Sequence, residues 1–355
     1  MKKKIFFVLS SFSAGGAERV FWLLCQYFDK SKFEIVVILL NTKRNGFSLN
    51  LPGVKIIDLK TMKASLSLIP LVKLIKKETP FAIYATGGHI NLLVAVASVF
   101  CNVPRLIARG TNIPSERIKY GNFKSRLLSK IGLSLLNRFD VIVCQSKEML
   151  DSWSSSRIID NKKLVIIANP VLESQYINSL DHLAPEKSLI IVARLSSVKG
   201  HDRLLTILSE LPSQYRLTIS GSDGGVQDLV DKQIGQLNLK HRVVRTGQIS
   251  DVCKVISQHM ILVLSSYTEA FPNVVLEALS VGTPVVTFRV GAVSNFIVNG
   301  FNGYIVEQGD NEGFKNSIVA ACNKSWDHAA ISRDVVNRFS VKKIVKQYEH
   351  LVIKQ

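Results

Sequence analysis

Two basic residues lie close together in the second half of the chain, Arg194 and Lys199, and Gly200 follows directly. They come after the apolar run 189–193, which is typical of a strand, and before a helical stretch. Two cations at the mouth of a strand–loop–helix unit suit a diphosphate, because they offset its charge and stabilise it as a leaving group. The alternative is a pair of solvated surface charges.

A second group of candidate residues surrounds Pro272. Glu269 and Glu277 are carboxylates eight residues apart, across a loop and the start of a helix for which Pro272 is a suitable first-turn residue. The backbone amides of Asn273 and Val274, in the first turn, can bind a phosphate. Glu277, one turn inside the helix, can accept hydrogen bonds from vicinal hydroxyls. The alternative is two surface glutamates, although the surrounding sequence is too apolar for an exposed face.

A third candidate is the loop after the first apolar run, where Gly15 and Gly16 precede a helical pattern. Paired glycines let backbone N–H groups approach a ligand, and the helix N-terminus adds partial positive charge. The spacing is not G-x-G-x-x-G, so it does not support a dinucleotide cofactor. Alternatively, these glycines serve only a tight turn.

These candidates need a scaffold of alternating strands and helices. Short β-rich apolar runs alternate with longer amphipathic stretches, which predicts an α/β fold of repeated βα units around parallel sheets. The expected strands are 4–9, 34–40, 55–59, 81–85, 105–108, 140–144, 163–168, 189–193, 216–220, 242–246, 260–264 and 284–288. In the first half, the expected helices are 16–29, 66–78, 89–100, 122–137 and 146–156.

The length of 355 residues exceeds what one ordinary core fills, and 47% hydrophobic residues suffice for two. Asn169–Pro170 is a turn signal, and the polar segment 172–187 is typical of a linker. We expect two doubly wound, Rossmann-like domains, 1–182 and 183–338, that face a ligand-binding cleft. The longest apolar run is about six residues, against roughly 18 in a membrane-spanning helix.

The net charge of +18 is concentrated in the first domain. Residues 1–182 hold 26 basic and 12 acidic residues, a net +14, and the remainder has a net +4. Two segments, 101–138 and 66–77, combine basic side chains with apolar residues at helical spacing, as in helices that lie on anionic membranes. Ordinary surface helices with a solvated cationic face are the alternative. No nucleic-acid-binding motif occurs, so we expect no such partner.

The cysteines and the N-terminal residues indicate in which cellular compartment the protein is expected. The five cysteines are scattered without C-x-x-C spacing, which indicates thiols in a reducing cytosol and no zinc site. The segment Met1–Lys4 with the apolar residues after it resembles the start of a secretory signal. Its apolar core of five residues is short, so we expect a first buried strand there instead.

Several motifs of the second domain together resemble the group 1 glycosyltransferases, family four in the usual sequence classification. They are Arg194 with Lys199–Gly200, the Gly221–Gly224 turn, Thr246–Ile249, and Glu269 to Glu277 followed by the run 278–286. The first domain is similar more loosely, through 15–19 and 140–146.

The resemblance implies a GT-B fold and transfer of a sugar from a nucleotide-diphosphate donor with retention of anomeric configuration. It implies no cofactor and no metal, and the chain has no D-x-D triplet, which a metal-dependent transferase would be expected to show. The segment 339–355 would form a C-terminal helix that crosses back to the first domain.

The resemblance also implies roles for single residues. Arg194 and Lys199 would bind the diphosphate and stabilise the departing nucleotide, and Glu269 would hold the donor sugar hydroxyls. These three are the expected catalytic residues, while Glu277 would hold the ribose hydroxyls. The other expected donor-binding residues are Gly15, Gly16, Gly221, Phe271, Pro272, Asn273 and Val274.

Two positions depart from the family pattern. Many relatives carry a histidine in the first-domain segment that touches the donor sugar, whereas this chain has Arg109 and Asn112 there. His89, which follows two glycines, is an alternative, so these three residues are candidate donor-sugar or acceptor contacts. The second departure is Asn295, where relatives often have a glutamate.

We therefore expect a retaining glycosyltransferase that moves a hexosamine or galactose from a UDP-sugar to a lipid-linked glycan acceptor. The expected process is surface polysaccharide synthesis, of O-antigen or capsule, at the cytoplasmic face of the cell membrane. Two alternatives stay open: a nucleotide-sugar epimerase on the same fold, for which no acid–base pair is evident, and a secreted two-domain sugar-binding protein. The second leaves Arg194 and Lys199 without a diphosphate to bind.

Overall fold

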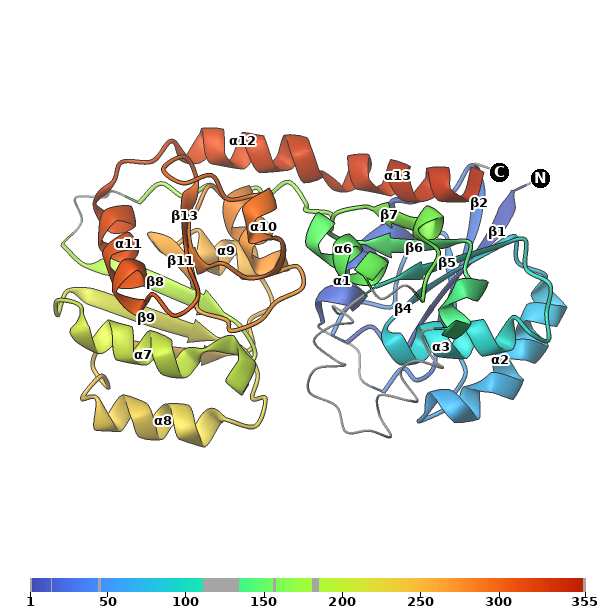
Figure 1. Cartoon of the computed structure of the whole chain (residues 1–355), viewed down its shortest axis with the longest axis horizontal. Helices are drawn as coiled ribbons and strands as arrows, with labels where there is room; N and C mark the ends of the chain where they lie inside the picture. The colour runs from blue at the N-terminus through green and yellow to red at the C-terminus, as the bar shows by residue number, and fades with distance from the viewer. Residues whose placement is uncertain are drawn as a thin grey trace. The chain divides into compact units, whose positions relative to one another are not determined.

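The computed structural model describes residues 2–13, 15–43, 46–110, 134–155, 158–180 and 185–353. Contacts divide the chain into two compact units, each built around one sheet (Figure 1). Unit 1 comprises Met1–Pro170 with Val341–Gln355, and unit 2 comprises Val171–Ser340.

Unit 1 contains, within the described residues, a seven-stranded parallel sheet in the order β3-β2-β1-β4-β5-β6-β7. Its strands are β1 (Lys3–Leu9), β2 (Phe33–Leu39), β3 (Val54–Asp58), β4 (Ala82–Thr86), β5 (Arg105–Arg109), β6 (Val141–Cys144) and β7 (Leu164–Ile166). Its helices are α1 (Gly16–Tyr27), α2 (Ala64–Glu78), α3 (Gly88–Ala97), the 3₁₀ helix η1 (Leu136–Arg138), α6 (Lys147–Ser155), η2 (Asn161–Lys163) and α13 (Val341–Ile353).

The first strand explains why the N-terminal residues fold as they do. β1 lies between β2 and β4, and Ile5 to Leu9 are all buried because helices cover both faces of a parallel sheet. The expected first buried strand is therefore confirmed.

The C-terminal helix α13 is part of unit 1 and packs on α1. Its Tyr348 is fully buried, and the Tyr348 carbonyl accepts a hydrogen bond from the Tyr84 hydroxyl in the middle of the sheet. Arg105 Nε donates to the Leu351 carbonyl at 3.0 Å. The last helix of the chain is thus tied to two strands that lie far away in the sequence.

Unit 2 contains, within the described residues, a six-stranded parallel sheet in the order β10-β9-β8-β11-β12-β13. Its strands are β8 (Lys187–Val192), β9 (Tyr215–Ser220), β10 (Val243–Gly247), β11 (Ile261–Leu264), β12 (Val285–Phe288) and β13 (Gly303–Val306). Its helices are η3 (Ser197–Lys199), α7 (His201–Glu210), α8 (Gln227–Gln236), α9 (Val252–Ile256), α10 (Asn273–Ser280), η4 (Gly291–Asn295), α11 (Asn311–Asn323) and α12 (His328–Phe339).

Both faces of this sheet are buried. Leu189 and Ile191 of β8 belong to one hydrophobic core, and Ile190 between them belongs to another. This alternation is what a strand requires when helices cover each face of its sheet. The expected fold class, an α/β protein with two Rossmann-like parallel sheets, is confirmed.

Two sequence expectations differ from the structure. β13 was not expected, because a four-residue run after two glycine-containing turns has little pattern of its own. The expected linker also packs on unit 2: Asn178 is buried, its backbone N–H donates to Val281 O at 2.7 Å, and its amide donates to Thr283 Oγ1 at 2.9 Å. The first boundary therefore falls after Pro170 rather than at residue 182.

None of the described helices is both long and apolar enough to cross a lipid bilayer. The five cysteines are free thiols, and Cys25, Cys144 and Cys322 are buried. Burial raises the pKa of Cys144 and of Cys322 to about 12, so neither is a reactive thiolate at neutral pH.

Candidate functional site

Each sheet has one place where the strand order reverses direction. In unit 1 it lies between β1 and β4, and in unit 2 between β8 and β11. At such a point the connections leave on opposite faces, so the loops after the two strands diverge and leave room for a ligand at their carboxyl ends. Candidate residues follow all four of these strands: Gly15 and Gly16 after β1, His89 after β4, Lys199 after β8 and Glu269 after β11.

In unit 2 a salt bridge joins the two loops at the reversal point. Lys199 Nζ, after β8, lies 2.6 Å from Glu269 Oε1, after β11. Ser266 Oγ donates to the same carboxylate oxygen at 2.8 Å. Both charged side chains keep partial exposure, 23% for Lys199 and 13% for Glu269. The pair is thus a preformed polar group that a ligand can still reach.

The backbone holds these two loops closely together. Gly200 has φ +65°, and a Cβ there would lie 2.0 Å from the carbonyl oxygen of Ser265. Tyr267 N donates to Val198 O at 2.8 Å, and Ser265 Oγ donates to Lys199 O at 3.2 Å. Gly200 is therefore required both by the left-handed turn and by the approach of the neighbouring loop.

Arg194 lies at the end of β8 and is exposed. A Cβ on Gly224 would lie 2.9 Å from Arg194 Cγ, and a Cβ on Gly221 would lie 2.0 Å from the Ala193 carbonyl oxygen. The glycine turn after β9 therefore leaves room for the strand end and for the aliphatic stem of Arg194. Arg194 and Lys199 both belong to the short connection between β8 and α7, at the carboxyl edge of the sheet.

The helix α10 begins at Asn273, and Pro272 is its N-cap residue in an extended conformation. By position, the N–H groups of Asn273 and Val274 precede the i→i−4 hydrogen-bond ladder of this helix. Glu277 is one turn inside and only 7% exposed. Phe271 packs edge-on against Phe296, with ring centroids 5.2 Å apart. The expected constellation of 269–277 is therefore brought to the same sheet edge as Lys199.

Gly291 brings a further loop to this edge. It has φ +46°, and a Cβ there would lie 2.4 Å from the carbonyl oxygen of Glu269. Asn295, the position that departs from the family pattern, ends the 3₁₀ turn that begins at Gly291 and is exposed. The Asn295 carbonyl accepts a hydrogen bond from the Arg338 guanidinium.

Sequence reasoning missed Arg203, which supports the loop after β11. Arg203 is 7% exposed, and its guanidinium donates to Ser265 O at 2.6 Å and to Ser266 O and lies 3.8 Å from the centroid of the Phe288 ring. A buried arginine that binds two consecutive carbonyls fixes the loop from which Glu269 projects. The available signal was a basic residue on the otherwise apolar face of α7 (201–210).

In unit 1 a hydrogen bond joins the two loops at the reversal point. Ser10 Oγ, after β1, and His89 Nε2, after β4, lie 2.6 Å apart, and His89 is exposed. Gly15 is the N-cap of α1, which begins at Gly16, so both glycines lie at a helix N-terminus beyond β1. Three of the expected unit 1 residues therefore share the carboxyl edge of this sheet.

Arg109 is placed differently from the expectation. Its side chain is 3% exposed, its NH2 group donates to Asn169 Oδ1 at 2.5 Å, and burial lowers its pKa. In this structure the guanidinium is engaged inside unit 1 rather than at the surface. Asn112 and most of the basic segment 101–138 lie outside the described residues.

No group of three His, Cys, Asp or Glu side chains within the described ranges is arranged to hold a metal ion. Metal independence remains a prediction.

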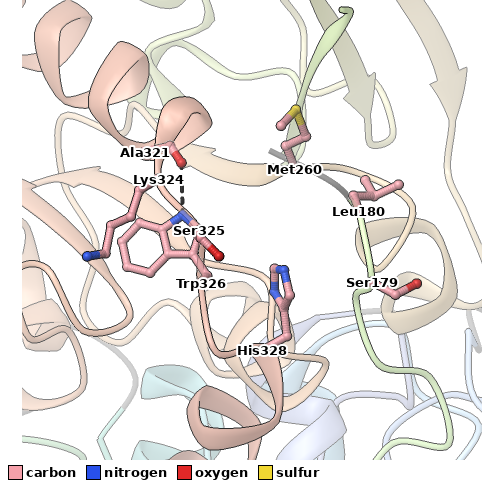
Figure 2. A pocket seen from close by; sticks show the side chains of 8 residues that line it. All are labelled: Ser179, Leu180, Met260, Ala321, Lys324, Ser325, Trp326 and His328. Atoms are coloured by element: carbon pink, nitrogen blue, oxygen red, sulfur yellow. Dashed lines mark hydrogen bonds between the residues drawn. The ribbon is translucent and has the colours of Figure 1, made fainter. Parts of the chain in front are cut away.

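A cavity of about 350 Å³ in unit 2 lies away from the candidate site (Figure 2). It opens at the edge where β11 begins, since Met260 directly precedes that strand, whereas Lys199 and Glu269 follow strands. Trp326 Nε1 donates to Ala321 O at 2.8 Å in its wall. The lining residues are Ser179, Leu180, Met260, Ala321, Lys324, Ser325, Trp326 and His328.

Comparison with known proteins agrees with this geometry. The family model "Glycosyl transferases group 1" matches residues 174–333, and "Glycosyltransferase Family 4" matches residues 14–174. Together the two models span residues 14–333, which include every described strand except β1, and the loop residues His89, Lys199 and Glu269.

Two curated relatives are named as glycosyltransferases. The chain is 29% identical over 303 residues, 80% of each protein, to a Campylobacter jejuni enzyme. That enzyme is N-acetylgalactosamine-N,N'-diacetylbacillosaminyl-diphospho-undecaprenol 4-alpha-N-acetylgalactosaminyltransferase. This chain is also 22% identical over 323 residues to the Escherichia coli UDP-Gal:alpha-D-GlcNAc-diphosphoundecaprenol alpha-1,3-galactosyltransferase. The match covers 83% of this chain and 81% of the relative.

Among solved structures, Anabaena Alr3699/HepE in complex with UDP and glucose superposes with a TM-score of 0.83. The identity is 21%, and the superposition covers 99% of this chain and all of that one. The two sheets, their reversal-point loops and the two matching family models show that the chain is a glycosyltransferase with a GT-B fold, and that it belongs to the group 1, family 4 glycosyltransferases.

Proposed function

We propose that the protein transfers a sugar from a UDP-sugar to a lipid-linked glycan acceptor during bacterial surface polysaccharide synthesis. The observation that carries the proposal is the loop group at the carboxyl edge of the second sheet: Arg194, the Lys199–Glu269 pair and the start of α10. This edge combines two cations and a helix N-terminus, which suit a diphosphate, with carboxylates that suit sugar hydroxyls.

The relatives support the finer parts of the proposal. Two of them are named for acceptors linked to undecaprenyl diphosphate, one is named for UDP-galactose, and a structural neighbour binds UDP. A galactose or an N-acetylhexosamine is therefore our proposed donor sugar. The net charge of +14 over residues 1–182 favours attachment to the cytoplasmic face of the membrane, where lipid-linked acceptors are found.

The proposed reaction retains the configuration at the sugar C1 and needs no metal. The bond from C1 to the diphosphate oxygen breaks and its electron pair leaves with UDP. The acceptor oxygen bonds to C1 on the same face, and its proton is released to the departing diphosphate. Arg194 and Lys199 carry out the charge stabilisation that a metal ion supplies in other transferases.

Glu269 has two tasks in this scheme. In the structure it contacts Lys199 through the 2.6 Å salt bridge. With donor bound, its second carboxylate oxygen would accept a hydrogen bond from a sugar hydroxyl. Glu277, buried one turn into α10, is the proposed acceptor for the ribose hydroxyls. On unit 1, Gly15 and Gly16 are proposed donor-binding residues, and His89 is a proposed donor-sugar or acceptor contact.

The test is nucleotide release from a panel of UDP- and GDP-sugars, with lipid extract of the host as acceptor and EDTA present. We expect release from one UDP-sugar, and NMR of the product should show the anomeric configuration of the donor. Lys199→Met should lower kcat/KM by about a hundredfold or more, as when one donor to a developing anion is removed.

The matched control is Lys232→Met, an exposed lysine of α8 in the same unit, which should leave turnover unchanged. Wild-type turnover in a folded Lys199→Met would contradict the site. A product with inverted anomeric configuration would contradict only the retaining mechanism. Nucleotide release that EDTA abolishes would contradict only metal independence. Binding of donor without any release would favour the sugar-binding alternative.

A further inference from the structure

The helix α2 of unit 1 has an outward face of unusual composition. Five of its residues point to solvent along one side: Leu66, Ile69, Lys73, Lys76 and Lys77, here called the α2 stripe. Leu66 is 63% exposed and Ile69 is 68% exposed. The opposite side is buried against the rest of unit 1, so this face is what the helix presents outward.

The apolar part of the α2 stripe continues onto the next element. α2 packs on α3, and the residues directly after α3, Val99 and Phe100, are each 55% exposed (Figure 1). The neighbouring Cys101 lies beside the middle of α2, with Sγ 3.7 Å from Val72 O. Large exposed apolar side chains therefore lie on α2 and on the segment that follows α3 and reaches the middle of α2, and apolar surface of this kind marks sites of interaction.

The charged residues of the α2 stripe are all of one sign. The second half of the α2 stripe consists of Lys73, Lys76 and Lys77. The charge of Lys76 acts to lower the pKa of the Cys101 thiol, although burial, the larger cause, raises that pKa overall. The acidic residue of α2, Glu78, lies off this face and is held by Lys4 at 2.6 Å and Lys55 at 3.2 Å. No carboxylate of α2 therefore offsets the lysines of the stripe.

We propose that the α2 stripe, with Val99 and Phe100, is the surface by which the enzyme rests on an anionic lipid membrane. Leucine, isoleucine and phenylalanine side chains enter the boundary between headgroups and acyl chains, and lysines bind lipid phosphates. Each lysine near an anionic surface contributes about 1 kcal/mol, so neither part of the stripe alone gives tight attachment. A protein partner would need acidic groups matched to these lysines, whereas an anionic bilayer supplies them everywhere.

This inference rests on the proposed function, since a lipid-linked acceptor is what brings such an enzyme to a membrane. It adds the orientation: α2 faces the lipid. The α2 stripe is on unit 1, the unit that carries the excess positive charge, and it is separate from the loops at the carboxyl edge of the sheet in unit 2.

The test is sedimentation with vesicles of phosphatidylglycerol and phosphatidylcholine in equal parts, compared with vesicles of phosphatidylcholine alone. The wild-type enzyme should bind the anionic vesicles only, and high salt should release it. Lys73→Gln with Lys76→Gln should weaken partitioning about 30-fold, from about 1 kcal/mol for each lysine. Leu66→Ser with Ile69→Ser should weaken it by about tenfold or more.

Matched controls lie on unit 2. Leu229→Ser with Val244→Ser changes two apolar residues that are 66% and 62% exposed, and Lys232→Gln with Lys240→Gln removes two exposed lysines. Both pairs should bind vesicles like the wild type. Thermal unfolding of every variant checks that it is folded.

Three results would overturn the inference: no binding of the wild type to anionic vesicles, unchanged binding of both α2 variants, or equal losses in the unit 2 controls. Self-association that depends on Leu66 and Ile69, without vesicle binding, would assign the surface to a second copy instead. Turnover with acceptor dispersed in detergent is measured in parallel. It should survive in the α2 variants, so failure of the docking surface is distinguished from failure of the proposed transfer reaction.

Discussion

At both reversal points, side chains from distant parts of the sequence meet. Lys199 and Glu269 come from loops 70 positions apart and meet at 2.6 Å, and Ser10 meets His89 over 79 positions at 2.6 Å. Because both pairs keep exposure, their desolvation cost is modest and each can exchange its partner for a ligand group. The motifs predicted Lys199 and Glu269 as separate candidates, whereas their contact is a property of the fold.

The same scale shows where sequence reasoning stops. Arg109 ends β5 and Arg194 closely follows β8, and only the structure separates the exposed Arg194 from the buried Arg109. Arg203 was missed because its role comes from two carbonyls of another loop. The type of a basic residue is visible in the sequence, but its partners depend on burial and on distant backbone groups.

His201 gives a prediction about pH. It follows Gly200, is 2% exposed, and neither ring nitrogen has a hydrogen-bond partner in the described part of the chain. Burial lowers its pKa from 6.5 to about 4. Between these values the unfolded chain binds a proton that the folded protein does not, so stability falls as the pH falls, by up to about 3 kcal/mol.

His201→Leu should therefore flatten the pH dependence of the free energy of unfolding between pH 6.5 and pH 4. Urea unfolding at several pH values measures it, with the exposed His241→Gln as control. Burial also lowers the pKa of His259, so some dependence should remain. Equal slopes for the wild type and His201→Leu would show that the His201 imidazole titrates normally.

At the scale of elements, the alternation of strands and helices was predictable and the ends of the sheets were not. β1, β8 and β11 are short apolar runs buried on both faces, which the sequence shows directly. β13 lies at an edge, where a strand has one neighbour and needs less of an apolar pattern. The segment 171–180 begins in what was expected to be a linker, yet Asn178 anchors it to unit 2 by hydrogen bonds that composition does not reveal.

The glycine turns allow a prediction at this scale. Gly200 and Gly300 both have positive φ, +65° and +80°, but a Cβ at Gly300 meets no atom within 4 Å, whereas one at Gly200 meets the Ser265 carbonyl oxygen at 2.0 Å. Gly300→Ala should cost about 1–2 kcal/mol, the strain of a left-handed residue with a side chain. Gly200→Ala should cost clearly more and should displace the loop that carries Glu269.

Chemical denaturation gives both free energies, and turnover reports the loop. We expect Gly300→Ala to keep full activity and Gly200→Ala to lose most of it while still folded. Equal destabilisation by the two substitutions would mean that the loops after β8 and β11 are not held as closely as described.

On the scale of the whole molecule, two units of one architecture carry different chemistry. Each has a parallel sheet with a polar contact at its reversal point, but the cation pair and the α10 N-terminus belong to unit 2, and the α2 stripe belongs to unit 1. The two-domain α/β fold and the asymmetry of charge were predictable from the sequence. Most of the basic segment 101–138, the first membrane candidate, lies outside the described residues, and α2 supplies an exposed basic face instead.

The central claim, that the loops at the carboxyl edge of the second sheet form the nucleotide site, is tested most directly by calorimetric titration with UDP. The comparison is between the wild type, Glu277→Gln and Glu312→Gln, an exposed glutamate of α11 that serves as the control. We predict one UDP per chain, affinity reduced at least about tenfold by Glu277→Gln through loss of charged hydrogen bonds, and unchanged affinity in the control. Wild-type affinity in a folded Glu277→Gln, or no UDP binding at all, would contradict the account.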